Sequence, residues 1–165
     1  MIALQIADIK TFMKKLLLSQ TFDRFLLLEG SITTFNTFHI DGRLQKSYYT
    51  QEEQERIKER SLSLWEEVRP FCLELIKGKK TPLAFCFTLQ LPASNTERLL
   101  AQTGVRIPPE QIQGLYIHLR YDGRRLSCAT GASLTFFTLE KKLDHAWDDM
   151  VQKYFRQEEI PFEVL

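Results

Sequence analysis

The chain has 165 residues, of which 44% are hydrophobic and 26% are charged, and its formal net charge is +1. This composition is near the average for globular proteins and excludes a disordered chain or a chain of membrane spans, and the length suits a single domain over residues 1–165. The near-neutral charge argues against a strong general attraction to nucleic acid or to an anionic membrane. The N-terminus shows no basic segment followed by a long apolar run, so we expect a soluble cytoplasmic protein.

Periodicity and capping residues predict an α+β fold with a mainly antiparallel sheet and helices packed on it. Two Asp-Gly pairs, Asp41-Gly42 and Asp122-Gly123, are read as hairpin turns. Thr50 with Glu53 opens a strongly charged helix, and Pro70 is expected to kink it or start a new one. In chain order we predict strands over residues 1–6, 22–30, 31–40, 44–49 and 82–91, and helices over residues 9–18, from 50 to 77 with the break at 70, 94–102 and 140–156.

Residues 115–139 are expected to organise the sheet, as two strands joined at Asp122-Gly123, a small-residue turn at Thr130-Gly131 and a third strand. If Asp122 and Gly123 are the two central turn residues, Arg120 lies opposite Arg125. Period-two alternation then separates two faces. The core face carries Leu115, Ile117, Leu119, Leu126 and Cys128, and the other face carries Tyr116, His118, Arg120, Arg125, Ser127 and Ala129.

The polar face of this hairpin is the first candidate site. Two arginines directly opposite each other repel unless water, a carboxylate or a bound anion lies between them. One interpretation is therefore a solvated face neutralised by nearby acids, and the sharper hypothesis is an anion-binding patch of His118, Arg120 and Arg125.

Lysines near two of the predicted helices form the second candidate site. Lys10 and Lys14 share an outer helix face, and Lys77 and Lys79 flank Gly78 at a helix C-terminus. A solvated surface and a favourable interaction with the helix dipole explain these lysines without any ligand.

The remaining residues with potential chemistry have structural explanations. His39 stands alone beside a turn. His145 with Asp144, Asp148 and Asp149 has spacing that could hold a metal ion, but these residues lie opposite the apolar stripe and are read as a solvated charged face. The three cysteines, Cys72, Cys86 and Cys128, lack metal-site or disulfide spacing and are read as small buried hydrophobes. We expect no metal, no cofactor and no catalytic motif of the common kinds.

Over nearly its full length the chain resembles a bacterial family of small uncharacterised proteins. The segments that carry this resemblance are MIALQIADIKTFMKKLLLSQTFDRFLLLE, SITTFNTFHIDG, VRPFCLELIKGKKTPL and HAWDDMVQKYFRQEEIPFE. The resemblance implies no established activity.

A second likeness concerns the order of elements and the stretch 117–139, which is similar to one domain of a DNA sliding clamp. That resemblance implies a clamp-like fold in which Lys10, Lys14, Lys77 and Lys79 would face DNA. The charged helix after Thr50, the helix near Glu97 and the C-terminal helix depart from the clamp pattern, and a similar fold does not establish function.

The leading functional hypothesis is a non-catalytic binding or assembly protein, with an unknown protein partner or self-association and no membrane contact. A clamp-like protein that binds nucleic acid weakly is the alternative. An enzyme is less expected; it would use His118, Arg120 and Arg125 on an anionic substrate and would need a pocket over that face.

Overall fold

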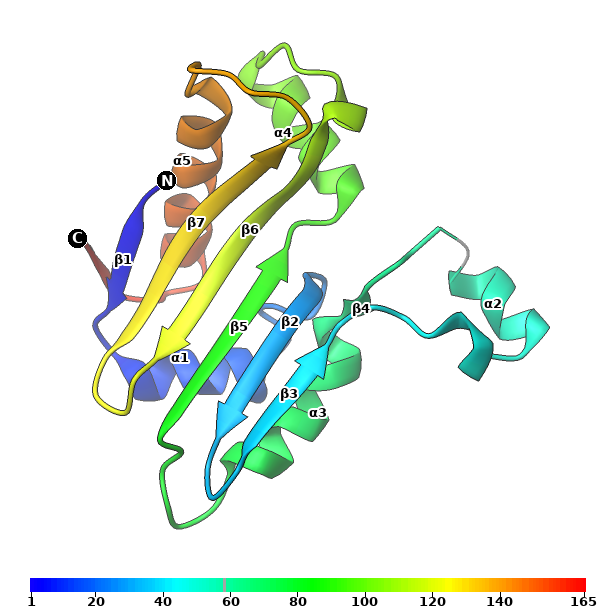
Figure 1. The fold of residues 1–165 in the computed structure, drawn as a ribbon. Coiled ribbons are helices and arrows are strands. Elements are labelled where there is room, and N and C mark those ends of the chain that lie inside the picture. The colour runs from blue at the N-terminus through cyan, green and yellow to red at the C-terminus, as the bar shows by residue number, and fades with distance from the viewer. Residues whose placement is uncertain (58) are drawn as a thin grey trace.

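The computed structural model describes residues 1–57 and 59–165. Within these residues, eight strands form one sheet in the order β3-β2-β5-β6-β7-β1-β8, with β4 paired to β2 (Figure 1). All the strand pairs are antiparallel. The predicted α+β class with a mainly antiparallel sheet is therefore confirmed.

The strands are β1 (Ala3–Ile6), β2 (Leu26–Thr33), β3 (Thr37–Asp41), β4 (Ser63–Leu64), β5 (Ala84–Gln90), β6 (Ile112–Tyr121), β7 (Leu126–Leu134) and β8 (Phe162–Val164). The α-helices are α1 (Ile9–Leu17), α2 (Gln51–Ile57), α3 (Trp65–Ile76), α4 (Ala93–Thr103) and α5 (Lys142–Gln157). Two short 3-10 helices, η1 (Lys46–Tyr48) and η2 (Pro109–Gln111), complete the elements.

Helices cover only one face of the sheet, and Figure 1 is viewed onto the uncovered face. The covered face forms the core because alternate residues of each strand point toward the helices. Two tryptophan side chains tie the layers together. Trp65 of α3 donates from Nε1 to the Leu16 carbonyl of α1 at 2.8 Å, and Trp147 of α5 donates to the Tyr116 carbonyl of β6 at 2.9 Å.

The hairpin of β6 and β7 has the predicted faces but not the predicted register. Arg120 lies opposite Ser127, and Tyr121 lies opposite Leu126, because residues 122–125 all belong to the turn. Asp122 closes that turn, since its Oδ1 accepts the backbone N–H of Arg124 at 2.9 Å and of Arg125 at 2.8 Å. The five residues predicted for the core face are all buried, so the division into two faces is confirmed.

The predicted turn at Thr130-Gly131 is wrong, as is the third strand after it. Strand β7 runs through both residues to Leu134, and its partner β6 follows it as far as Ile112. Residues 135–139 form no strand, and the small strand β8 near the C-terminus was not predicted. β8 has only three residues and pairs with β1 at the sheet edge.

The first hairpin also differs from the prediction. Strand β2 continues through Gly30 to Thr33, and the turn to β3 lies at residues 34–36. Gly30 is needed there because a Cβ would lie 2.7 Å from the Phe87 ring of β5. Asp41-Gly42 is not a hairpin turn, and no strand follows over residues 44–49. The chain leaves the sheet at this point after the Gly42 N–H donates to the Leu28 carbonyl at 2.9 Å.

The helical predictions hold in part. Thr50 and Glu53 form the predicted reciprocal cap at the start of α2. That helix ends at Ile57, and α3 is a separate helix that begins at Trp65 and continues through Pro70 without the predicted break. Helix α4 begins at Ala93, and Gly104 ends it in left-handed geometry with φ of 69°.

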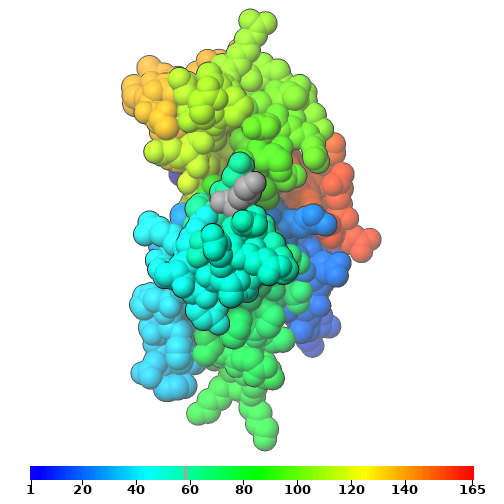
Figure 2. Space-filling model, turned by 90° about the vertical axis from the view of Figure 1, so that its right-hand side faces the viewer, coloured from blue at the N-terminus to red at the C-terminus, as the bar shows by residue number. Residues whose placement is uncertain are grey.

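The segment between β3 and β4 projects from the sheet as an arm that carries η1 and α2 (Figure 1). Figure 2 shows the arm standing out toward the viewer in front of the sheet and α3. None of the residues of α2 is buried. Isolated helices of this length are marginal in water, so α2 depends on local contacts, namely the cap formed by Thr50 and Glu53 and the ion pair between Glu52 and Arg56.

Candidate binding surfaces

A groove of about 580 Å³ lies between α1 and α3, on the helical side of the sheet. Its apolar lining comes from two helices and two strands. Ile9, Met13 and Leu17 belong to α1, and Leu73 and Ile76 belong to α3. The buried rings of Phe85 and Tyr121, from β5 and β6, add to the lining. The groove therefore presents apolar surface to solvent between two helices that are separated in the sequence by β2, β3, the arm and β4.

Four lysines also line this groove. Lys10 and Lys14 come from α1, and Lys77 and Lys80 come from the end of α3 and the loop after it. As far as the described residues go, no carboxylate is among those that line the groove. Lys77 is ion-paired outside the groove lining, with Nζ 2.7 Å from Glu74 Oε1. The groove thus combines an apolar surface with charged side chains of positive sign on both walls.

Three of the four predicted nucleic-acid-binding lysines, Lys10, Lys14 and Lys77, are brought together here. Lys79 is exposed but does not line the groove, and Lys80 takes the place that was assigned to it. Between Lys77 and these two residues the chain bends at Gly78, which has a φ of 140°. The sequence carries no signal for which of the two consecutive lysines lines the groove.

The uncovered face of the sheet carries two rows of polar side chains across neighbouring strands. One row runs from His39 through Ser31, Cys86 and Arg120 to Ser127, in the order β3, β2, β5, β6, β7. The next row runs through Asp41, Glu29, Thr88, His118 and Ala129. Acidic side chains therefore lie over β2 and β3, and basic ones lie over β6.

His118 and Arg120 are both exposed on β6, whereas Arg125 lies outside the strands in the turn. The predicted opposition of Arg120 and Arg125 is wrong, because Ser127 occupies the position opposite Arg120. His118 Nδ1 and Thr88 Oγ1 share a hydrogen bond of 3.1 Å. Within the described part of the chain, no carboxylate lies within 4.0 Å of the Arg120 guanidinium. Arg120 is therefore an exposed cation without an acidic partner.

A shallow hollow of about 490 Å³ lies over β2, β3 and β5, beside His118 but not lined by it. Glu29, Asp41, His39 and the thiol of Cys86 contribute to its surface. The prediction that all three cysteines are buried is wrong for Cys86, because its side chain points to the uncovered face. Cys72 and Cys128 are buried as predicted, and burial raises the pKa of both thiols, for Cys72 to about 12.

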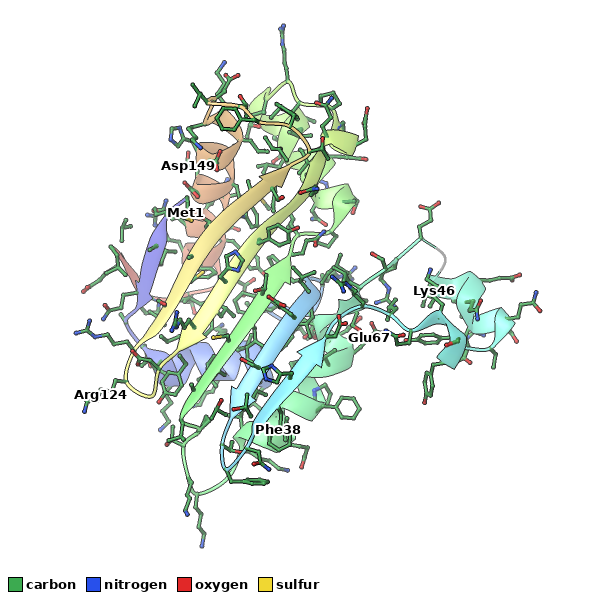
Figure 3. The ribbon with its side chains drawn as sticks, viewed as in Figure 1. Met1, Phe38, Lys46, Glu67, Arg124 and Asp149 are labelled. Carbon is green, nitrogen blue, oxygen red and sulfur yellow. The ribbon has the colours of Figure 1, made fainter. Side chains whose placement is uncertain are left out.

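The acidic face predicted on α5 is only partly solvated. Asp148 is 8% exposed; it accepts a hydrogen bond from Thr130 Oγ1 and lies 3.3 Å from the amino group of Met1. Asp149 is exposed (Figure 3). His145 is exposed as well. No group of three or more His, Cys, Asp and Glu side chains is arranged to hold a metal ion in the part of the chain that the structure describes. Asp148 therefore stabilises the packing of α5 on β7 and β1.

Comparison with known protein families places the chain in a family. A model of the family of unknown function DUF5721 covers residues 15–163. No curated protein and no solved structure matches the chain, so the likeness to a clamp domain has no support from relatives. Across the described residues, none of the helices has the length and apolar character needed to cross a bilayer.

Proposed function

Because the chain belongs to this family of unknown function, we propose from the structure alone that it is a non-catalytic binding protein, and that the groove between α1 and α3 holds an acidic amphipathic segment of a partner protein. One observation carries this proposal: an exposed apolar groove of about 580 Å³ is lined by four lysines and, among the residues that the structure describes, by no carboxylate. Apolar surface of this kind marks interaction sites on soluble proteins.

The distribution of the lysines favours a peptide over a small amphiphile. Lys10 and Lys14 stand on the α1 wall, while Lys77 and Lys80 stand on the wall formed by α3 and the following loop. A fatty acid or a similar ligand has one charged head and needs cations at one end of a closed cavity. An amphipathic helix instead carries acidic residues along both borders of its apolar stripe, which fits lysines on both walls.

The size of the groove sets the length of the partner segment. Helix α1 has nine residues, which corresponds to roughly 13 Å at 1.5 Å per residue. A partner helix lying along this wall would make contact through about two to three turns. Its apolar residues would recur at positions i, i+3 or i+4, and i+7, and would pack against Met13, Leu17 and Ile76.

A clamp-like role on duplex DNA is the alternative, and the gathering of Lys10, Lys14 and Lys77 around one groove is the observation that favours it. Phosphate contacts would use the lysines alone and leave the apolar lining exposed. The peptide proposal therefore requires contact with Met13, Leu17 and Ile76, whereas the DNA proposal does not. The two proposals also differ in how steeply the binding affinity falls with salt.

Display of a random library of 16-residue peptides on the purified protein tests the proposal. We expect enriched peptides to combine apolar residues at helical spacing with several Asp or Glu residues. A synthetic copy of an enriched peptide should bind with a dissociation constant in the micromolar range by fluorescence anisotropy. Lys10→Glu combined with Lys80→Glu, one change on each wall, should weaken binding at least ten-fold.

Lys141→Glu combined with Lys153→Glu is the matched control, because it makes the same change in net charge at exposed lysines outside the groove. This control should bind the peptide like the unmodified protein. Enriched peptides without acidic residues, or equal binding by both double variants, would contradict the proposal. A different result would support the clamp-like role. In that case the protein would bind a 20-bp duplex, the affinity would fall steeply between 50 and 200 mM salt, and Lys10→Glu/Lys80→Glu would abolish binding.

A further inference from the structure

Two aromatic side chains on the uncovered face of β6, those of Tyr116 and His118, lean over glycines of the sheet. Glycines make this possible, since a Cβ on Gly114 would lie 2.5 Å from Cζ and the hydroxyl oxygen of Tyr116, and a Cβ on Gly131 would lie 3.1 Å from Nε2 of His118. Each ring therefore occupies the space above a residue that has no side chain. A ring that lies along the sheet turns one of its faces toward solvent.

The two rings form a continuous surface, which we call the aromatic ledge (Tyr116 and His118). Their planes differ by 28° and their centroids are 6.0 Å apart. The hydrogen bond between His118 Nδ1 and Thr88 Oγ1 holds the imidazole in this position. Burial of the tyrosine against the sheet raises the pKa of the Tyr116 hydroxyl. The ledge is thus fixed by packing before any ligand arrives.

An exposed cation follows the ledge on the same strand and the same face. Arg120 is two residues beyond His118, a separation of roughly 7 Å along an antiparallel strand. No acid neutralises it within the described residues. An aromatic surface with a guanidinium at this distance matches a planar base joined to a phosphate.

The rest of the uncovered face restricts where such a ligand lies. Glu29 and Asp41 place two carboxylates over β2 and β3, where Arg43 supplies one cation, so that half of the sheet attracts phosphate less than Arg120 does. On the other side of the ledge, Ser127, Ala129 and Gly131 of β7 are small and carry no charge. A bound anionic ligand would therefore lie over β6 and β7.

We propose that the aromatic ledge and Arg120 form a nucleotide-binding site, in which a base stacks on Tyr116 and His118 and its phosphate pairs with Arg120. The nucleotide is either free or part of a single strand, since both present the same base face and phosphate. A duplex covers its base faces by stacking, so it does not fit this site.

Three binding measurements test this proposal. Fluorescence anisotropy measures the binding of a labelled 12-nucleotide single-stranded RNA of mixed sequence and of the same RNA in a duplex. Calorimetry measures the binding of ADP. The single strand should bind more tightly than the duplex. Tyr116→Ala and Arg120→Glu should each weaken binding of the strand about ten-fold, while Tyr116→Phe should keep it because the ring remains. If ADP binds and the same variants weaken its binding, free nucleotide is a ligand of the site. If the single strand binds and ADP does not, the site is specific for single strands.

The glycines provide an independent test of ring orientation. Neither Gly114 nor Gly131 has positive φ, so alanine is compatible with the backbone at both positions. Gly114→Ala should push the Tyr116 ring off the sheet and weaken binding, with a smaller effect for Gly131→Ala, where the contact is less close. Tyr48→Ala removes an exposed tyrosine of the arm and should change nothing.

The proposal is overturned if neither RNA nor ADP binds, if Tyr116→Ala binds like the unmodified protein, or if the duplex binds as tightly as the single strand. The ledge and the lysine-lined groove lie on opposite faces of the sheet. Lys10→Glu/Lys80→Glu should therefore leave RNA binding intact, so failure of one proposal does not imply failure of the other.

Discussion

The Asp23 carboxylate and the Arg69 guanidinium form a two-point ion pair, with Nε to Oδ1 at 2.8 Å and Nη2 to Oδ2 at 3.0 Å. Asp23 is 5% exposed and lies between α1 and β2, while Arg69 belongs to α3. Nη1 of Arg69 also donates to the Leu17 carbonyl at the end of α1. This pair therefore holds together the two helices that form the lysine-lined groove.

Arg69→Ala should lower the free energy of unfolding by about 3 kcal/mol, because it leaves a buried carboxylate without its partner. Arg69→Lys should recover only part of this loss, since an ammonium cannot make the two-point contact. Urea unfolding followed by tryptophan fluorescence measures both changes. A loss below about 0.5 kcal/mol for Arg69→Ala would show that Asp23 finds other partners or water.

Gly42→Ala should destabilise the protein by about 3 kcal/mol or more, because the added Cβ would lie 1.7 Å from the Leu27 carbonyl oxygen and the backbone of β2 would have to move. Gly104→Ala serves as the comparison. Gly104 has open space around it but a φ of 69°. Its substitution by alanine should therefore lower the free energy of unfolding by only about 1 kcal/mol, through backbone strain. Thermal unfolding of the two variants should rank them in this order, and the reverse ranking would contradict the packing around Gly42.

Cys86 should be the single thiol that reacts quickly with a disulfide reagent such as DTNB in the folded protein at pH 8. Cys72 and Cys128 are buried and should react only after denaturation, when all three thiols become accessible. Cys86→Ser should abolish the fast phase. A second fast thiol in that variant would mean that one of the buried cysteines opens to solvent in the native state.

Stability should fall as the pH rises above about 9. The buried Cys72 thiol has a pKa raised to about 12 in the folded protein, whereas an unfolded thiol titrates near 9. Between these values the unfolded chain has lost a proton that the folded chain retains, so alkali favours unfolding by up to about 1.4 kcal/mol per pH unit for this thiol. Cys72→Ala should make the dependence of the unfolding free energy on pH from 9 to 11 less steep, while the buried Cys128 thiol, whose pKa is also raised, should maintain part of the slope. An unchanged slope in Cys72→Ala would contradict the contribution of this thiol.

The faces of the sheet were predictable from the sequence, and the register was not. Alternation in β6 and β7 assigns His118 and Arg120 to the polar face whether the turn has two or four residues, since a shift of two preserves the face of every side chain. The register depends on the turn alone. The carboxylate of Asp122 accepts two backbone N–H groups and widens the turn to four residues, which moves Arg125 out of the strand.

The groove and the aromatic ledge depend on contacts that no local pattern reveals. Lys14 and Lys80 share a groove because the sheet places α1 beside α3, and the strand order that does this follows from pairing between distant segments. The sequence predicts Gly30 at the end of a strand and Gly131 in a turn, and it carries no signal for the role of Gly114. In the structure each provides room for an aromatic ring from elsewhere on the sheet, and only the structure shows which ring it is.

The position of β1 in the sheet constrains how the chain folds during synthesis. β1 lies between β7 and β8, and Leu4 pairs with Cys128 and Val164. β1 is therefore synthesised long before its partners β7 and β8, and it has no partner in the sheet until residues 126–134 have been made. Closing a loop of this length is slow, so the earliest compact intermediate should form from β2, β5 and α3. Until β7 appears, the apolar residues Leu4 and Ile6 remain available to chaperones.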